Sequence, residues 1–272
     1  MTDTGPYNAT IIEREDLHAA LSIFRIRFDS DEQPDFEPGQ FTTLGLIDHD
    51  APPPNPDSPR SRRGGPKMIR RAYTIASPPK LVSNLEFYIV RIDSGTFTDP
   101  FWQLKAGDRL FMDTNIKGNF TLEGIPDGKD LVMVGTGTGL APFWAMLNTY
   151  GGTQRWHKLI LIEGCRYVRD LGYYNQLTKI AAGDDSVIYL PTVTREPADS
   201  SWQGQRGRVH VILEPDRFKQ LTGITLDPNQ CHILLCGSPQ MIDEASENLT
   251  KLGFVTKDRD HPDGNLHFER YW

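Results

Sequence analysis

Leu131-Val-Met-Val-Gly-Thr-Gly-Thr-Gly-Leu-Ala-Pro142 is the stretch that decides the fold of the second half of the chain. Four apolar residues lead into a glycine-rich turn, Gly135 to Gly139, and then into a helical segment from Ala141 to Tyr150. Glycines between a strand and a helix let a phosphate approach the backbone N–H groups at the helix start. A purely structural tight turn stays open as an alternative, because Leu140 stands where the dinucleotide fingerprint has glycine.

The pattern of an apolar run followed by a helical run repeats toward the C-terminus. Apolar runs lie at 159–162, 187–193 and 232–236, and helical runs at 170–181 and 239–252. Such alternation is typical of a parallel sheet covered by helices. We therefore expect an α/β domain over residues 128–272, entered through the turn-rich linker Pro126-Asp127-Gly128.

Residues 1–127 have a different pattern, in which short alternating runs are separated by Gly, Pro and Asp. The runs lie at 21–28, 41–47, 85–92 and 109–112. Several short strands with turn residues between them predict an antiparallel barrel or sandwich. Residues 48–65 are rich in proline, which cannot donate to a strand ladder, so we expect an exposed loop there.

The composition excludes several classes of protein. With 272 residues and a net charge of −7, the chain is not expected to hold nucleic acid by general electrostatics. Its cysteines, Cys165, Cys231 and Cys236, are too few and too scattered for a disulfide framework or a four-cysteine iron–sulfur site, and we expect no metal. The first ten residues lack the features of a signal peptide, and no apolar stretch reaches the length of a membrane span. We therefore expect a cytoplasmic protein.

Two clusters in the first half suit a flat, phosphorylated ligand. In Arg71-Ala-Tyr-Thr74, the arginine can neutralise a phosphate, the tyrosine ring can stack on an aromatic ligand, and the threonine hydroxyl can bond a ring nitrogen. In Gly95-Thr-Phe-Thr98, donors precede a short helical stretch at 99–104 and suit an anion. Each cluster also has a plain structural interpretation, the first as an ordinary strand and the second with Thr98 as a helix N-cap.

These motifs occur in the same order as in the ferredoxin–NADP(+) reductases, and the chain most resembles the bacterial ferredoxin/flavodoxin reductases. The matching segments, which span nearly the whole chain, are Arg71-Ala-Tyr-Thr74, Gly95-Thr-Phe-Thr98, Gly135-Thr-Gly-Thr-Gly139, Cys236-Gly-Ser-Pro-Gln-Met241 and Tyr271-Trp272, with support from Gly39-Gln-Phe-Thr-Thr-Leu-Gly45, Leu85-Glu-Phe-Tyr88 and Thr194-Arg-Glu196. The resemblance implies a six-stranded antiparallel β-barrel that binds FAD, followed by an α/β domain with a five-stranded parallel sheet that binds NADP(H).

For FAD, the resemblance implies that Arg71 contacts the pyrophosphate, that Tyr73 stacks on the flavin ring, and that Thr74 bonds the ring where the family usually has serine. Tyr73, Thr74 and Cys236 are the expected catalytic residues, with Cys236 beside the nicotinamide. The remaining expected FAD contacts are Ala72, Tyr88, Ile89, Val90, Gly95, Thr96, Phe97, Thr98 and Thr136. Of the terminal aromatic residues, Tyr271 is expected against the flavin and Trp272 near the adenine.

The choice between NADP and NAD depends on charges that follow the apolar runs of the second half. Glu163 follows the run at 159–162, and a carboxylate there suits the free ribose hydroxyl of NAD. Arg166, Arg195 and Arg208 match family positions at the 2′-phosphate of NADP, and clustered arginines suit that group. Any one of them can be a solvated residue, but three at one expected edge favour NADP. The other expected NADP contacts are Gly137, Thr138, Cys165, Thr194, Cys236, Gly237, Ser238, Gln240 and Met241.

The implied activity is FAD-dependent electron transfer between NADP(H) and a one-electron carrier, ferredoxin or flavodoxin, by a monomer or dimer. Such carriers are typically acidic, so the basic segment Arg60-Ser-Arg-Arg-Gly-Gly-Pro-Lys67 and Arg70 would provide a docking face, unless the segment is only a solvated loop. The rival interpretations are an NADH-dependent oxygenase reductase, a simple flavin reductase, and a redox-sensing subunit without turnover.

Overall fold

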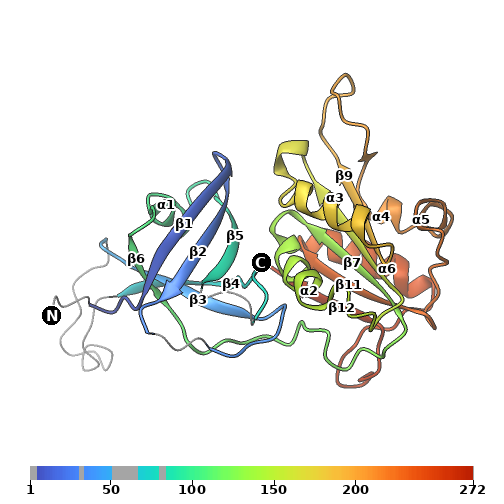
Figure 1. Cartoon of the computed structure of the whole chain (residues 1–272), viewed down its shortest axis with the longest axis horizontal. Coiled ribbons are helices and arrows are strands. Elements are labelled where there is room, and N and C mark those ends of the chain that lie inside the picture. Colours follow the sequence, from blue (N-terminus) through green and yellow to red (C-terminus); the bar gives the residue numbers. More distant parts are fainter. Residues whose placement is uncertain (1–4, 31–33, 51–66, 80–83, 272) are drawn as a thin grey trace. The chain divides into compact units, whose positions relative to one another are not determined.

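The computed structural model describes residues 5–30, 34–50, 67–79 and 84–271. The chain forms two compact units, Met1–Gly118 and Asn119–Trp272 (Figure 1). The division falls before the boundary expected at residue 127, because the segment between these points packs within the second unit. There the Arg155 guanidinium donates to the Asp127 carboxylate over 2.6 Å and to the Ile125 carbonyl over 3.1 Å.

The first unit is built on a six-stranded antiparallel sheet, which confirms the expected fold class. Its strands are β1 (Ala9–His18), β2 (Leu21–Phe28), β3 (Phe41–Ile47), β4 (Met68–Thr74), β5 (Leu85–Val90) and β6 (Arg109–Met112), in the order β4-β3-β6-β1-β2-β5. A short helix, α1 (Thr98–Phe101), lies between β5 and β6. The core of this unit contains Ile11, Phe24, Ile26, Leu44, Phe87, Ile89, Phe101, Leu110 and Met112.

The two ends of this strand order are joined through the segment that follows β4. The Ala76 N–H donates to the Glu86 carbonyl of β5 over 2.8 Å, and the Ser77 hydroxyl accepts the Glu86 N–H over 3.1 Å. These bonds give partners to backbone groups that an open sheet edge would leave unpaired. The sheet is therefore barrel-like rather than open.

The second unit contains a parallel sheet with six strands, one more than the five expected. The strands are β7 (Asp130–Thr136), β8 (Lys158–Cys165), β9 (Val187–Val193), β10 (Gln205–Arg206), β11 (Cys231–Gly237) and β12 (Leu266–Arg270), in the order β10-β9-β8-β7-β11-β12. The two-residue strand β10 pairs with Thr192 and Val193 at the end of β9. A strand this short leaves no periodic pattern in the sequence.

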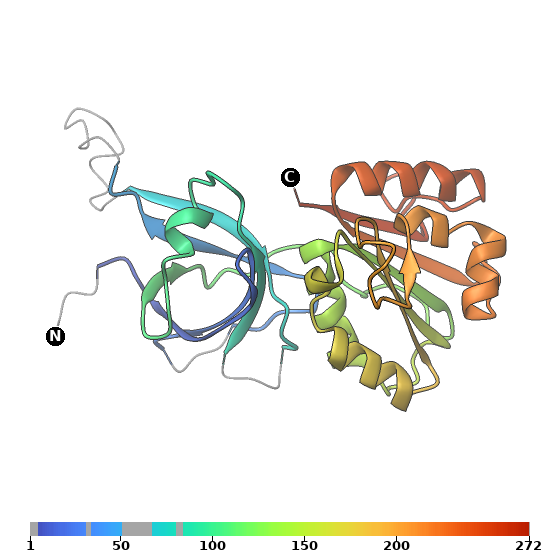
Figure 2. The ribbon, with the colours of Figure 1, turned by 90° about the horizontal axis from the view of Figure 1, so that it is seen from above.

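Helices cover both faces of the parallel sheet. They are η2 (Gly137–Leu140), α2 (Ala141–Tyr150), η3 (Val168–Asp170), α3 (Tyr174–Gly183), α4 (Val209–Ile212), α5 (Pro215–Thr222) and α6 (Pro239–Lys251). Figure 2 shows α2 and α3 on one face and α5 and α6 on the other. The longest described helix, α6, has 13 residues, and no helix within the described ranges is long and apolar enough to cross a membrane.

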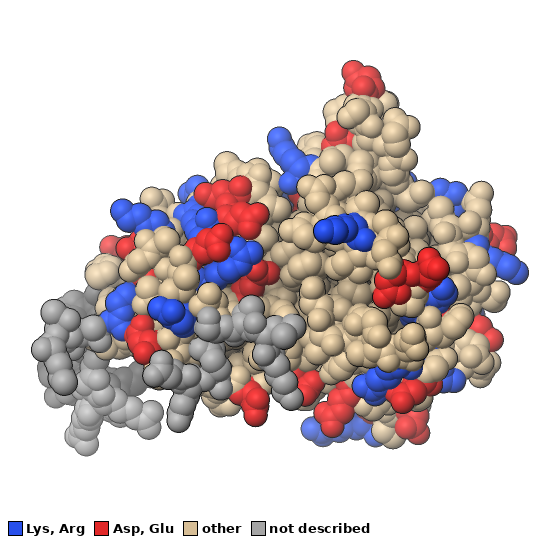
Figure 3. All heavy atoms as spheres, viewed as in Figure 1, with Lys and Arg blue, Asp and Glu red and all other residues tan. Residues whose placement is uncertain are grey.

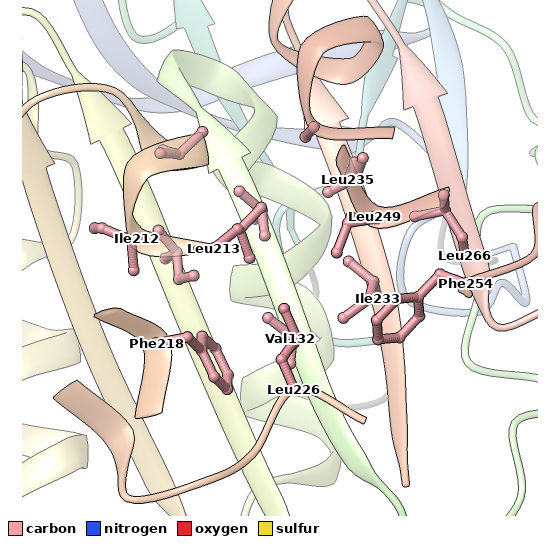
Figure 4. Packing of buried hydrophobic residues seen from close by; sticks show 14 of the residues in the cluster. Val132, Ile212, Leu213, Phe218, Leu226, Ile233, Leu235, Leu249, Phe254 and Leu266 are labelled. Atoms are coloured by element: carbon pink, nitrogen blue, oxygen red, sulfur yellow. The ribbon is translucent and has the colours of Figure 1, made fainter. Parts of the chain in front are cut away.

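The main core of the second unit lies under α4, α5 and α6 (Figure 4). Phe218 of α5 and Leu249 of α6 belong to the same buried cluster as Val132 of β7 and Ile233 of β11. Because helices cover both faces of the sheet, β11 is buried along its whole length. This explains why its sequence is an almost continuous apolar run rather than an alternating one.

Candidate functional site

The two clusters of the first unit that suit a flat, phosphorylated ligand lie together. Arg71 is exposed on β4, at one end of the strand order, and its Nη2 donates to the Thr96 hydroxyl over 3.1 Å. A second guanidinium nitrogen donates to the Arg70 carbonyl over 2.8 Å. An exposed guanidinium beside a hydroxyl is a suitable partner for a phosphate.

Tyr73, two residues along β4 from Arg71, is held by aromatic packing. Its ring centroid lies 5.7 Å from that of Phe97 and 6.4 Å from that of Phe101, which is nearly parallel to it at 21°. Burial raises the pKa of the Tyr73 phenol, although nearby Arg71 acts in the opposite direction, so the ring is uncharged at neutral pH. A fixed neutral ring can stack on a flat ligand.

The loop Gly95–Thr98 has a conformation that only glycine permits at its first residue. A Cβ on Gly95 would lie 2.2 Å from the Thr98 hydroxyl and 2.9 Å from the Ile92 carbonyl. The Thr98 hydroxyl donates to that same carbonyl over 3.0 Å and accepts the Ile92 N–H over 3.3 Å. Thr98 is therefore not the helix N-cap, because the N-cap of α1 is Phe97, which makes no side-chain cap bond.

Other expected FAD contacts of the first unit have buried side chains. These are Thr74, Tyr88, Ile89, Phe97 and Thr98, each less than a tenth exposed. Their apolar groups pack in the core, so only their backbone groups and hydroxyls suit a polar ligand. Thr96 and Ala72 are exposed beside Arg71.

The turn after β7 lies where the strand order of the second unit reverses. The chain leaves β7 toward β8 on one side, and β11 lies on the other, which is the usual ligand position in open α/β sheets. The Thr136 hydroxyl accepts the Ser238 N–H over 3.1 Å, which links the ends of β7 and β11. A Cβ on Gly139 would lie 2.3 Å from the Cys236 carbonyl, so this glycine is needed for close backbone packing.

Cys236 and Tyr271 meet at the carboxyl end of β11. Cys236 is fully buried, and the Tyr271 side chain forms a hydrogen bond with its thiol. The Tyr271 N–H donates to the Gly237 carbonyl over 3.3 Å, so the residue after β12 is held against the end of β11. Burial raises the pKa of the Cys236 thiol well above its ordinary value, which keeps it protonated. Trp272 lies outside the described residues.

Arg166 and Arg195 stand side by side beyond β8 and β9. The Arg195 N–H donates to the Arg166 carbonyl over 2.8 Å, and the Thr194 N–H donates to the Cys165 carbonyl over 3.1 Å. Both arginine side chains are exposed, and neither forms an ion pair within the part of the chain that the structure describes. Two guanidinium groups that form no ion pair among the described residues, both beyond the carboxyl ends of β8 and β9, suit an anion.

Arg208 reaches the same sheet edge but already has an anionic partner. The preceding residue, Gly207, donates its N–H to the Val193 carbonyl at the end of β9 over 2.9 Å. Nη1 of Arg208 donates to the two Glu244 carboxylate oxygens over 3.0 and 3.1 Å. Of the three arginines expected at the 2′-phosphate, Arg208 is therefore the one whose positive charge a carboxylate of the protein already compensates.

Glu163 is not the exposed, NAD-favouring carboxylate that its position after an apolar run indicates. It is fully buried, accepts a hydrogen bond from the Tyr189 hydroxyl, and lies 3.7 Å from the Cys165 sulfur. Burial raises the pKa of its carboxyl to about 8, against the effect of the hydrogen bonds that it accepts. A neutral carboxyl that faces inward is not available to a ribose hydroxyl.

Two of the expected NADP contacts on α6 have other partners. Met241 is buried in the core of the second unit. Gln240 is exposed, and its amide donates to the Glu244 carboxylate over 2.8 Å. Sequence reasoning missed Glu244 and a further neighbour of its carboxylate, the His210 imidazole, whose Nδ1 lies 3.1 Å away. The available signal was that Glu244 lies four residues after Gln240, on the same face of a helix.

The basic segment expected at a docking face lies largely outside the described residues, since residues 51–66 are not described. Lys67 is described, and its ammonium group lies 3.1 Å from the Asp48 carboxylate. Arg70 is exposed, with its guanidinium 4.3 Å from the centre of the Phe111 ring. On the face shown in Figure 3, basic and acidic side chains are interspersed.

The residues present fit both expected cofactors. The first unit offers an exposed arginine, a fixed neutral phenol and a glycine loop, which suit a dinucleotide with a flat ring. The second unit offers a backbone turn at the switch point of a parallel sheet and two uncommitted arginines at the same edge.

Comparisons with known proteins identify the family of the chain. Residues 133–247 match the family model of the oxidoreductase NAD-binding domain. The chain is 31% identical over 252 residues to the flavodoxin/ferredoxin–NADP reductase of Buchnera aphidicola subsp. Schizaphis graminum, covering 92% of this chain and 93% of that protein. It is 33% identical over 245 residues to the ferredoxin–NADP reductase of Azotobacter vinelandii, covering 86% of each chain.

A solved structure extends the likeness to the fold. It is the crystal structure of a ferredoxin NADP+ reductase from Neisseria gonorrhoeae with bound FAD and NADP, which is 26% identical to this chain. The comparison gives a TM-score of 0.82 and covers 98% of this chain and 99% of the other. The chain belongs to the bacterial-type ferredoxin/flavodoxin–NADP reductase family.

Proposed function

We propose that this protein is an FAD-dependent reductase that exchanges electrons between NADP(H) and ferredoxin or flavodoxin. The observation that carries the proposal is the length of the match. The chain covers 93% of a flavodoxin/ferredoxin–NADP reductase, so the match spans both units and not one shared domain. The residues of both units supply groups that suit the two cofactors.

In the first unit, β4 and the Gly95 loop would hold FAD. Bound FAD supplies two-electron chemistry toward NADPH and one-electron chemistry toward the carrier. Arg71 would bind the pyrophosphate, because its guanidinium is exposed and already oriented by Thr96. The Tyr73 ring, fixed by Phe97 and Phe101, would orient the flavin, and the Thr74 hydroxyl would bond its edge.

In the second unit, the carboxyl ends of β7, β8, β9 and β11 would hold NADP(H). Arg166 and Arg195 would bind the 2′-phosphate, since guanidinium groups match the geometry of phosphate oxygens. Thr136 and the glycine turn would place the backbone close to the nucleotide. Cys236, protonated and buried, would give a small apolar wall that excludes water near the nicotinamide.

The proposed partner is an acidic one-electron carrier, and the proposed compartment is the cytoplasm. Cys165, Cys231 and Cys236 are all unpaired and buried, which suits a reducing compartment. The basic segment at 60–67 stays our proposed docking face for the carrier. Because that attraction is electrostatic, salt should weaken it.

The test is an anaerobic assay of the purified protein with NADPH and either a ferredoxin or a flavodoxin. We expect one FAD per chain that stays bound through gel filtration, and carrier reduction that depends on NADPH. Free flavin that is consumed as a substrate would instead identify a flavin reductase. Retained FAD that NADPH does not reduce would contradict the proposal and favour a redox-sensing subunit.

A further inference from the structure

Only one of the three guanidinium nitrogens of Arg208 contacts its carboxylate partner. Nη1 contacts both oxygens of Glu244, whereas Nη2 and Nε of Arg208 have no protein partner within the described residues. The side chain of Arg208 is 55% exposed and that of Glu244 is 35% exposed, so an anion in solution can reach the pair. A phosphate that binds the free side of this guanidinium would therefore lie next to a carboxylate.

Glu244 has two other polar neighbours, His210 on α4 and Gln240 on its own helix, α6. Nδ1 of His210, on α4, lies 3.1 Å from one carboxylate oxygen, and the Gln240 amide donates to the other over 2.8 Å. The hydrogen bond from Gln240, with help from Arg208 and His210, lowers the pKa of the Glu244 carboxyl below its ordinary value. Glu244 is thus an ionised carboxylate with several polar neighbours, and it lies beside Arg208, near the strand ends where we propose that NADP(H) binds.

We propose that Glu244 is a specificity-determining residue that lowers the affinity of the protein for the 2′-phosphate and so weakens its preference for NADP(H) over NAD(H). This inference rests on the proposed function and on the expectation from the sequence that Arg208 lies beside the 2′-phosphate. An arriving phosphate competes with the carboxylate for Arg208 and is repelled by its charge. NAD(H) lacks the 2′-phosphate, so its binding does not involve this competition.

The position of the other arginines explains why the effect is specific. Arg166 and Arg195 have no carboxylate partner within the described residues and bind phosphate without competition. Arg208 is the one expected 2′-phosphate ligand whose positive charge is compensated by the protein. Removing that compensation adds one net positive charge beside the phosphate and leaves the other contacts unchanged.

The test is equilibrium binding of NADP+ and of NAD+ to the FAD-loaded protein carrying Glu244→Gln. Glutamine keeps the length of the side chain and an acceptor for Arg208 but removes the charge. For a solvent-accessible pair we expect NADP+ to bind about fivefold more tightly, with NAD+ affinity unchanged. Thermal unfolding of the same preparation checks that the variant is folded.

Glu247→Gln is the matched control, because it removes the same charge from the same helix. The Glu247 carboxylate pairs with Lys251 over 2.7 Å, and its side chain is 72% exposed. We expect this variant to bind both nucleotides as the wild type does. If it also gained affinity for NADP+, the effect would be one of overall charge, which would overturn the role of Glu244.

A second background tests whether Glu244 acts through Arg208. Arg208→Gln should weaken NADP+ binding, and adding Glu244→Gln to it should then increase the affinity for NADP+ less than it does in the wild-type background, because only the direct repulsion by the carboxylate remains to be removed. Equal or weaker NADP+ binding by Glu244→Gln alone would overturn this inference while leaving the proposed function intact. Failure of the wild-type protein to bind NADP+ would overturn both, and the carrier assay would then fail as well.

Discussion

The candidate sites of the two units consist of different kinds of groups, mainly side chains in the first unit and mainly backbone in the second. In the first unit, the candidate site consists mainly of side chains on one strand, β4, and on the loop beside it. In the second unit it is mainly backbone at the ends of buried strands, with arginines placed around it. A substitution of an exposed side chain in the first site, such as Arg71, should therefore affect ligand binding alone, whereas one in the glycine turn of the second site should also affect folding.

The largest expected effect concerns Glu163, the buried side chain beneath the second site. Its ordinary pKa is 4.5 and its pKa in the folded protein is about 8, so unfolding releases a proton between these values. The contribution of this carboxyl to the free energy of unfolding is thus fully present below pH 4.5 and is lost as the pH rises to about 8. Glu163→Gln should remove this pH dependence. The free energy of unfolding of the variant should therefore exceed that of the wild type by a few kcal/mol once the pH has risen to about 8.

Urea unfolding, followed by tryptophan fluorescence at about pH 5.5 and about pH 8.5, measures this difference. The difference in the free energy of unfolding between Glu163→Gln and the wild type should grow as the pH rises. Glu247→Gln, an exposed carboxylate on α6, should show no such growth. A pH-independent difference would mean that Glu163 is already ionised in the folded protein.

Gly139→Ala tests whether the second site is inseparable from the fold. The new Cβ would lie 2.3 Å from the Cys236 carbonyl, so backbone must move, and we expect about 2–3 kcal/mol of destabilisation with loss of NADP+ binding. Gly183→Ala is the control, because nothing lies within 4 Å of its Cβ. Normal stability of the Gly139 variant would contradict the close packing of η2 on β11.

Arg71→Ala tests the opposite claim for the first site. Loss of a charged phosphate contact should weaken FAD binding by about tenfold to a hundredfold, with little change in the unfolding of the apoprotein. Arg70→Ala is the matched control on the same strand, since its guanidinium lies over the Phe111 ring. FAD titration by fluorescence quenching measures both. Equal losses for the two variants would argue against a specific pyrophosphate contact.

The smallest of these effects is expected at Arg195, one of several arginines at the second site. Arg195→Ser should lower the ratio of NADP+ to NAD+ affinity by about tenfold, because one phosphate contact is lost and the others stay. Arg259→Ser, in the loop before β12 at the opposite sheet edge, should leave the ratio unchanged. An unchanged ratio in Arg195→Ser would remove that residue from the 2′-phosphate site.

The sequence predicts the second unit better than the first because buried parallel strands and their glycine turn leave strong patterns. α2 and β9 have the bounds expected, Ala141–Tyr150 and Val187–Val193. β1 was missed because exposed charged residues such as Glu13 and Glu15 interrupt its apolar pattern. The pairing that makes it a strand comes from β2 and β6, and the pattern of residues within β1 contains no information on these partners.

The candidate site shows the same limit at the level of single residues. Glu163 follows an apolar run, and its sequence position suggests an exposed carboxylate. Its burial depends on Tyr189 of β9, whose hydroxyl bonds to it across the sheet. Glu244 looks like a solvated helix residue, and its importance comes from Arg208, which precedes α4. Contacts between elements decide the role of both carboxylates, and the sequence does not state such contacts.

The most direct test of the central claim is anaerobic stopped-flow absorbance at the flavin band, with NADPH and NADH compared side by side on the purified protein. We expect fast bleaching by NADPH and much slower bleaching by NADH, because the 2′-phosphate would meet Arg166 and Arg195, as we propose, while Glu163 is turned inward. Equal or faster bleaching by NADH would contradict the assignment of the arginines. A purified protein without flavin absorbance would contradict the FAD site itself.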